Sequence, residues 1–270
     1  MIKMIVTDLD GTLLNEKSKV SRYTRKQLKK YKDEGIIITI ATGRIYSMAI
    51  DSLKSIKYID YIITDNGACV FDVKENKYIY FNYINRDIVK NIYNMFNERF
   101  KYINFCDKNY VFKYTKEKCD NFKRLKLINF YKKLDSKSKD ITHITIKTKV
   151  NDEIFDVAKE IRENYPTLEP IIMQDSFVND KWLDISVKNC NKFNTINWLI
   201  NRKNIKSDEI IVFGDGLNDI DMVANFPNGV AMNNALDEVK KNTKYITEYS
   251  NKQNGVVLFL EDYFKKNLKN

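Results

Sequence analysis

The segment MIVTDLDGTLL, residues 4–14, places two aspartates directly after a short apolar run. A second segment, IIVFGDGLNDIDM, residues 210–222, repeats this order, with four apolar residues before a cluster of acidic and amide side chains. Apolar runs of this length are typical of buried strands in a parallel sheet. Because open α/β sheets bind ligands at the carboxyl ends of their strands, we expect the two acidic clusters to meet at one edge of a single sheet.

The carboxylates of these two segments indicate the chemistry of the site. Asp8 and Asp10 stand two residues apart after the first strand, and Asp215 follows the second. Clustered carboxylates repel one another unless a cation lies among them, and Mg²⁺ prefers oxygen ligands. A divalent ion beside a nucleophile and an acid suits phosphoryl transfer. The sequence therefore predicts a Mg²⁺ site that acts on phosphate groups.

At these residues the chain resembles the haloacid dehalogenase-like hydrolase superfamily, and within it the Cof-type phosphatases. Further motifs carry the resemblance: ATGR at residues 41–44, NGA at residues 66–68, Lys192, and tail positions including Asn234 and Asn254. These motifs occur in order at both ends of the chain, and the middle of the chain has none. The resemblance implies a Rossmann-like core and a phosphatase that forms an aspartyl-phosphate intermediate.

The predicted catalytic residues are Asp8, Asp10 and Lys192. Asp8, at a strand end, is expected to be the nucleophile, and Asp10 to protonate the leaving alkoxide and later take a proton from water. Lys192 would place a positive charge near Asp8 and the phosphoryl oxygens. Cof-type chains usually carry glycine after this lysine, where Phe193 stands here, and Lys188 is the nearest alternative lysine.

The phosphate-binding residues are predicted after the second strand. Thr42 offers a hydroxyl, and Gly43 offers a backbone N–H at a helix start, which together suit an anion. An ordinary Thr N-cap with a permissive glycine is the plainer alternative. Lys192 and, by the resemblance, Asn218 would also contact the phosphate. Arg44 fits either a substrate contact or a surface position in the first turn of a helix.

The predicted Mg²⁺ ligands are Asp215, a carboxylate oxygen of Asp8 and the backbone carbonyl of Asp10. By the resemblance, Asp219 orients these ligands from the second shell of the metal and pairs with Lys192. The plainer interpretation of the second segment is a turn followed by a helix cap. That interpretation does not account for the matching DLDGT segment at the other end of the chain.

The predicted fold class is α/β, with a Rossmann-like parallel-sheet core and an inserted α+β cap domain. Strand and helix patterns alternate in residues 1–82 and again in residues 188–270, which indicates one discontinuous core with a sheet covered on both faces. Residues 83–187 show strand pairs interleaved with helices, including a basic helix near residues 120–132. We expect this insertion to form the cap and to select the substrate.

The composition of the chain argues against several classes of protein. The formal net charge is +10, but the excess is spread over both parts of the chain, so nucleic-acid binding is not expected. The apolar runs are too short to span a membrane, we expect no secretory signal, and the 4 cysteines lack metal-ligand spacing. A single histidine, His143, argues against a histidine-based phosphatase. We expect a cytoplasmic protein, a monomer or weak homo-oligomer, acting on a small phosphorylated metabolite such as a sugar phosphate or a phosphorylated cofactor.

Two other functions fit parts of this pattern. A phosphomutase would transfer the aspartyl phosphate to a second hydroxyl and release little free phosphate. A phosphoryl-accepting regulatory protein or a nucleic-acid-binding protein is the alternative from a different class. Receiver domains also group acids and a lysine at strand ends, but they are far shorter and carry no such insertion.

Overall fold

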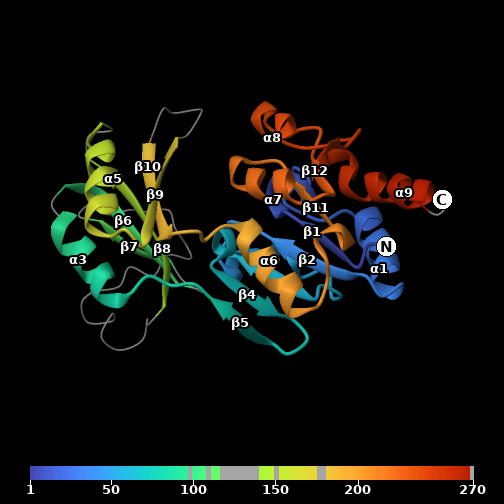
Figure 1. Ribbon diagram of the computed structural model, residues 1–270, viewed down its shortest axis with the longest axis horizontal. Helices are drawn as coiled ribbons and strands as arrows, with labels where there is room; N and C mark the ends of the chain where they lie inside the picture. Colours follow the sequence, from blue (N-terminus) through green and yellow to red (C-terminus); the bar gives the residue numbers. More distant parts are fainter. Residues whose placement is uncertain (97–98, 108–110, 116–139, 149–151, 175–180, 268–270) are drawn as a thin grey trace. The chain divides into compact units, whose positions relative to one another are not determined.

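The computed structural model describes residues 1–96, 99–107, 111–115, 140–148, 152–174 and 181–267 (Figure 1). The chain divides into two compact units. The first joins Met1–Tyr80 to Asn191–Asn270, and the second is Phe81–Cys190. In the described part of the chain, no helix combines the length and the apolar character that crossing a membrane requires.

The first unit is built on an eight-stranded sheet in which β1 lies near the centre. The strands, in spatial order, are β13 (Tyr245–Ile246), β12 (Gly229–Ala231), β11 (Ile210–Gly214), β1 (Met4–Thr7), β2 (Ile37–Ala41), β3 (Tyr61–Thr64), β4 (Cys69–Asp72) and β5 (Lys77–Phe81). Neighbours from β13 to β3 are parallel, and β4 is antiparallel to β3. The predicted α/β class with a mainly parallel sheet is confirmed.

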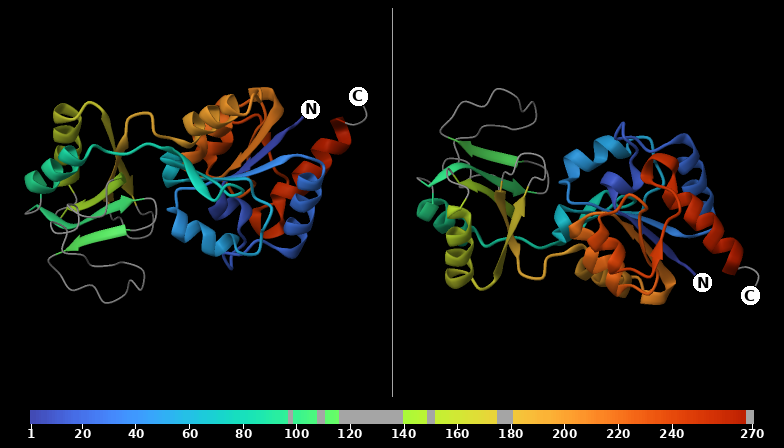
Figure 2. Two further views of the ribbon diagram at one scale, coloured as in Figure 1. Left: turned by 90° about the horizontal axis from the view of Figure 1, so that it is seen from below. Right: turned by 90° about the horizontal axis from the view of Figure 1, so that it is seen from above.

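Helices cover both faces of this sheet. α6 (Lys192–Arg202) and α7 (Ile220–Asn225) lie on one face, and α1 (Arg22–Asp33), α2 (Tyr46–Leu53) and α9 (Gly255–Asn267) lie on the other (Figure 2). The short helix α8 (Asp237–Lys241) packs near α7. Every residue of β1 and β11 is buried because both faces are covered, which explains their uninterrupted apolar sequence. α1 begins after the predicted N-cap, Ser21, whose hydroxyl accepts a hydrogen bond from the Thr24 amide.

The second unit has its own antiparallel sheet and its own apolar core. The strands, in spatial order, are β7 (Val111–Thr115), β6 (Phe100–Asp107), β8 (Ile141–Thr148), β10 (Lys181–Val187) and β9 (Leu168–Gln174). α3 (Arg86–Phe96) and α5 (Glu153–Asn164) cover one face of this sheet (Figure 1). Along β8, Ile144 and Ile146 are buried while His143 and Thr145 are only partly covered, as a one-sided sheet requires. The helix predicted near residues 120–132 lies outside the described residues.

Candidate active site

The register of the central strands brings the two acidic segments together. β1 pairs with β2 on one side and with β11 on the other, so that Thr7 lies opposite both Ile40 and Phe213. The Asp8 amide continues this ladder and donates to the Phe213 carbonyl at 2.9 Å. All three strands end at the same edge, which places Asp8 next to the segment that follows β11. The expected meeting of the two segments is thus present in the fold.

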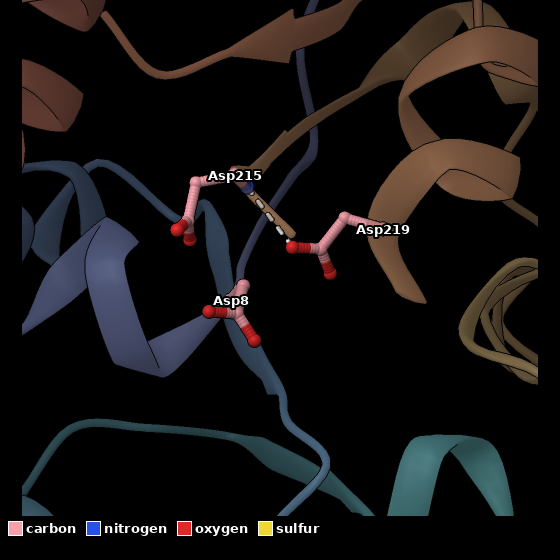
Figure 3. A group of neighbouring side chains, drawn as sticks. All are labelled: Asp8, Asp215 and Asp219. Carbon is pink, nitrogen blue, oxygen red and sulfur yellow. Dashed lines mark hydrogen bonds between the residues drawn. The ribbon is translucent and has the colours of Figure 1, made fainter. Parts of the chain in front are cut away.

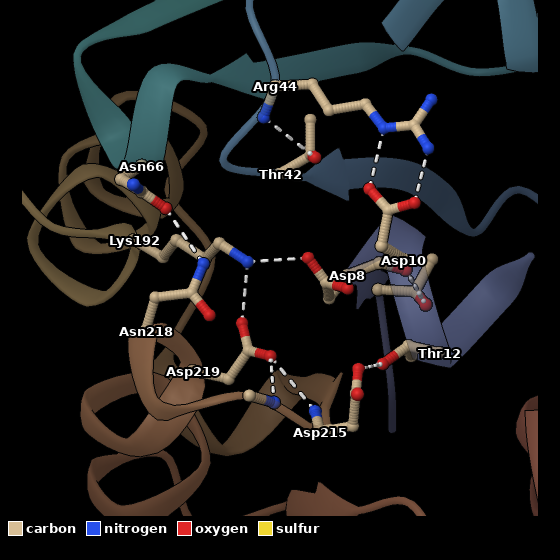
Figure 4. A network of polar contacts seen from close by, with 12 residues as sticks. Asp8, Asp10, Thr12, Thr42, Arg44, Asn66, Lys192, Asp215, Asn218 and Asp219 are labelled. Carbon is tan, nitrogen blue, oxygen red and sulfur yellow. Dashed lines mark hydrogen bonds and ion pairs between the residues drawn. The ribbon is translucent and has the colours of Figure 1, made fainter. Parts of the chain in front are cut away.

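Lys192 joins two of the predicted acidic residues. It is the first residue of α6 and is only 1% exposed. Its Nζ donates to Asp8 Oδ1 and to Asp219 Oδ1, each at 2.6 Å (Figure 4). The second oxygen of Asp219 accepts the amides of Asp215 and Gly216 at 2.9 and 3.0 Å. Asp219 therefore holds the lysine with one oxygen and shapes the loop after β11 with the other.

Asp215 completes the cluster from the loop after β11. The Thr12 hydroxyl donates to Asp215 Oδ1 at 2.6 Å. Gly11, which has a φ of 74°, lies so close that a Cβ at this position would overlap the Asp215 carboxylate. Figure 3 shows the carboxylates of Asp8, Asp215 and Asp219 around a common space, and one oxygen from each lies within 4.8 Å of the others.

Negative charge exceeds positive charge in this cluster. Burial raises the pKa of Asp8, and the Asp219 charge adds to the rise, while Lys192 opposes it. Burial also raises the pKa of Asp215 to about 6, although the Thr12 hydrogen bond opposes the shift. Burial pulls the pKa of Lys192 down, but Asp219 and Asp8 outweigh it and leave the pKa raised. Three carboxylates thus lie around one lysine, which pairs directly with only Asp8 and Asp219, and a divalent cation would neutralise this excess of negative charge.

The donor atoms of the cluster fit a hard divalent cation. Within the described residues, no donor is paired with the second carboxylate oxygen of Asp8 or of Asp215. Oxygen ligands with such spare capacity suit ions such as Mg²⁺. Both oxygens of Asp219 already accept hydrogen bonds, so this residue fits a supporting role better than direct ligation.

Asp10 lies apart from the buried cluster. Its carboxylate is about half exposed and points to Arg44, which binds it through Nε at 2.6 Å and through a second guanidinium nitrogen (Figure 4). A further nitrogen of Arg44 donates to Ser52 Oγ at 2.9 Å. Arg44, whose role the sequence left open, therefore contacts the predicted acid. A paired, bidentate guanidinium gives this carboxylate a defined direction.

The residue after Lys192 does not disturb the site. Phe193 packs its ring against Phe226 with a centroid separation of 5.0 Å. Phe226 directly follows α7, so the Phe193 ring packs beside the helices that cover the sheet rather than against the carboxylates. The departure from the usual glycine is therefore accommodated by packing between α6 and α7.

The predicted phosphate-binding residues gather around the loop after β2. Thr42 is buried, and its hydroxyl accepts the Arg44 amide at 3.1 Å. A Cβ on Gly43 would lie 3.5 Å from Asn218 Nδ2, so Asn218 reaches across from the loop after β11. The structure thus brings Thr42, Gly43 and Asn218 together beside the carboxylate cluster.

Three residues to which the sequence assigned no role also support the site. Thr12 binds Asp215, and Asn66 accepts a hydrogen bond from Asn218 Nδ2 at 2.8 Å. Asn234 donates to the Gly11 carbonyl at 2.8 Å and so holds the loop that carries Asp8 and Asp10. Each residue lies in a segment that carried the resemblance. Its role was not visible there because the partner is distant in sequence.

Comparison with known proteins identifies the family. A family model of haloacid dehalogenase-like hydrolases matches residues 5–260. The chain belongs to this family. A protein of Mycoplasma genitalium, provisionally named a phosphatase, is 30% identical to this hydrolase over 97% of the chain and 98% of its own length. The 5-amino-6-(5-phospho-D-ribitylamino)uracil phosphatase YcsE of Bacillus subtilis is 28% identical over 94% of this chain and 93% of its own length.

Solved structures agree on the fold. A haloacid dehalogenase-like hydrolase from Bacteroides thetaiotaomicron superposes with a TM-score of 0.82 and 23% identity, covering 97% of this chain and 100% of the other. A protein from Thermotoga maritima gives a TM-score of 0.80 and 24% identity, with 97% of each chain covered. Together with the family model and the phosphatase relatives, this likeness establishes the hydrolase as a phosphatase enzyme with the fold of its family.

Proposed function

We propose that this hydrolase is a Mg²⁺-dependent phosphatase of small phosphomonoesters that works through an aspartyl phosphate on Asp8. The observation that carries the proposal is the buried Asp8 carboxylate, which has one oxygen held by Lys192 and the other unpaired within the described residues. A carboxylate fixed in this way has a defined lone pair for attack on phosphorus. A structural ion pair would not need a second oxygen left without a donor.

The reaction would proceed in two displacements. In the first, the unpaired oxygen of Asp8 forms a bond to phosphorus and the ester P–O bond breaks, while Asp10, released from Arg44 and protonated, gives its proton to the leaving alkoxide. In the second, Asp10 takes a proton from water as the water oxygen attacks the same phosphorus and releases Asp8 and inorganic phosphate. Lys192, Thr42 and the Gly43 amide would stabilise the phosphoryl oxygens in both steps.

The proposed Mg²⁺ would be held by Asp8, Asp215 and the backbone carbonyl of Asp10. When bound, it supplies positive charge to the transferring phosphoryl group and offsets the excess of carboxylates. Asp219 would keep Lys192 and the loop after β11 in place rather than bind the ion. The hydrogen bonds already made by both Asp219 oxygens support this division.

The proposal is tested by a hydrolysis screen with and without Mg²⁺. Sugar phosphates, phosphorylated cofactors and 5-amino-6-(5-phospho-D-ribitylamino)uracil, the compound in the name of the Bacillus relative, form the panel. We expect free phosphate from at least one ester, loss of the activity with a chelator, and recovery on adding Mg²⁺. Isomerised ester without free phosphate would instead indicate a phosphomutase. A chelator-resistant rate would contradict the metal assignment.

Asp10→Asn is expected to slow the hydrolysis of phosphate esters to an extent that depends on the acidity of the leaving group. The variant retains the backbone carbonyl but loses the carboxyl proton, so alkyl esters should lose far more rate than aryl esters, whose leaving groups need little protonation. Rates on an alkyl and an aryl phosphate, measured side by side at the same Mg²⁺ concentration, check this. Equal losses on both esters would show that Asp10 acts only through Arg44 or the metal.

We propose that the second unit, around residues 83–187, is the cap that selects the leaving group, while the chemistry belongs to the first unit. On the sheet face away from α3 and α5, the second unit carries His143 near Asp184, with 4.0 Å between Nε2 and Oδ1. Such polar groups can distinguish esters through their alcohol portion.

His143→Ala is expected to change kcat/KM between two phosphate esters by about ten- to a hundredfold. The Mg²⁺ concentration dependence should stay as in the wild type. Lys159→Ala, on the exposed side of α5, is the matched control and should leave the ester preference unchanged. A uniform loss on all esters, or an altered Mg²⁺ dependence, would contradict the separation of selection from chemistry.

We also propose that the enzyme acts in the cytoplasm as a monomer or weak homo-oligomer and binds no nucleic acid. The spread of its positive charge over the whole chain supports the last point. Light scattering checks the oligomeric state, and a gel shift with nucleic acid at physiological salt should show no complex.

A further inference from the structure

The turn after β3 has an unusual backbone. Asp65, Asn66 and Gly67 follow one another with φ values of 57°, 53° and 107°. Left-handed conformations are costly for residues with a Cβ, and asparagine tolerates them better than most. Such a run persists only where surrounding groups fix it, and it is often found at functional sites. β3 is parallel to β2 and β1, so this turn lies at the edge of the sheet that carries the carboxylate cluster.

Hydrogen bonds fix this turn from two sides. The Asn66 amide donates to the Thr42 carbonyl at 3.1 Å, and the Asp65 amide donates to the Arg44 carbonyl at 3.0 Å. On the other side, the Thr195 hydroxyl of α6 donates to the Gly67 carbonyl at 2.6 Å. The turn therefore connects the predicted phosphate loop with the helix that begins at Lys192.

The Asn66 side chain adds a third connection, to the loop after β11. Its Oδ1 accepts a hydrogen bond from Asn218 Nδ2 at 2.8 Å (Figure 4). This bond passes beside Gly43, where a Cβ would lie 2.9 Å from Asn66 Oδ1 and 3.5 Å from Asn218 Nδ2. A glycine at position 43 thus leaves the space through which the two amides meet. Without the bond, the exposed Asn218 side chain could adopt other rotamers.

We propose that Asn66 is a positioning residue that holds the Asn218 amide in one orientation before substrate binds. The inference rests on the proposed function, in which Asn218 contacts the phosphate group or a water molecule beside it. Asn66 would act by joining the phosphate loop after β2 to the acidic loop after β11, so that both are set in place together. Preorganisation of this kind raises turnover because less rearrangement is needed in the transition state.

Asn66→Gly tests the side chain without straining the backbone, because glycine accepts positive φ. Asn76→Gly is the matched control, since Asn76 has a φ of 50° and lies exposed in the turn between β4 and β5. We expect Asn66→Gly to lower kcat/KM for a phosphate ester about tenfold, mainly through kcat. The Asn76→Gly variant should stay within about twofold of the wild type, the scatter of such assays being far below a tenfold effect.

Combination with Asn218→Ala shows whether Asn66 acts through Asn218. The double variant should be no slower than Asn218→Ala alone, because the bond is already lost. A double variant that shows the product of the two single losses would overturn the proposal. So would an Asn66→Gly enzyme that keeps more than about half of the wild-type kcat/KM, or one whose loss of rate accompanies a large fall in melting temperature.

A nuclear magnetic resonance measurement tests the inference without an activity assay. The side-chain amide signal of Asn218, assigned by its absence in Asn218→Ala, should shift in Asn66→Gly and stay in place in Asn76→Gly. If the signal does not move, the bond does not hold Asn218 and the proposal is wrong. If the wild type hydrolyses no ester, the proposed function fails, and this signal alone still decides whether Asn66 positions Asn218.

Discussion

Asp8→Asn is expected to lower turnover by at least about a thousandfold while the fold stays intact. Asparagine keeps the shape of the side chain but lacks the charged oxygen that would attack phosphorus. The change also removes one proposed ligand of the metal, so both the intermediate and the metal charge are affected. Steady-state hydrolysis measures the loss of turnover. Radiolabelled phosphate retained on the protein after denaturation reports whether the aspartyl phosphate still forms.

The same substitution is expected to leave stability unchanged or raise it in the absence of divalent ions. Asp8 is buried, and its pKa is raised because burial disfavours its charge, so a neutral amide relieves repulsion with Asp219. Asp221→Asn is the control, since Asp221 lies in the second acidic segment but accepts a hydrogen bond from Asn191 Nδ2 at 2.8 Å and has no part in the proposed chemistry. If Asp8→Asn kept more than a tenth of the wild-type rate, Asp8 would not be the nucleophile.

Lys192→Met is expected to cause the largest loss of stability. Methionine fills a similar volume but leaves Asp8 and Asp219 buried without their shared cation. Breaking a buried ion pair by removing one partner typically costs about 3–5 kcal/mol of unfolding free energy. Urea unfolding without divalent ions measures this loss, and Mg²⁺ should recover part of it by supplying the missing charge. Activity should fall by at least about a hundredfold, since one stabilising charge is lost from the transition state.

Lys188→Met is the matched control for this experiment. Lys188 is exposed, precedes α6, and is the nearest other lysine to the proposed position. We expect its replacement to change the unfolding free energy by less than about 0.5 kcal/mol and to leave activity unaltered. If the two variants lost similar stability, the buried network would contribute far less than its geometry indicates.

The core of the fold could be predicted because its strands are buried on both faces. The apolar runs of β1, β2 and β11 can be recognised from the sequence alone, and acidic residues directly follow β1 and β11. β4 was not predicted, because its sequence CVFD shows no alternation and has a single β-branched residue, whereas β1, β2 and β11 are richer in such residues. α9 was also missed, since a short apolar run such as VVLFL fits either a strand or a buried helix.

The parts of the site that escaped prediction depend on partners distant in sequence. Arg44 binds Asp10 across 34 residues, and Asn66 binds Asn218 across 152 residues. No periodic pattern records such a pairing, because each side chain alone is an ordinary polar residue in a loop. The motifs predicted which loops form the candidate site. Only the fold shows which side chains of these loops contact one another.

The central position of β1 has a consequence for the synthesis of the protein. β1 is synthesised before its neighbour β11, which follows about two hundred residues later in the chain, so one edge of β1 stays unpaired during this interval. At usual rates of translation that interval is on the order of 10 to 40 s. Asn234 and Asn251, which hold the Gly11 and Leu14 carbonyls, arrive later still. A nascent chain that already contains Asp8 therefore cannot assemble the proposed site until β11 and the loop that follows it have been made.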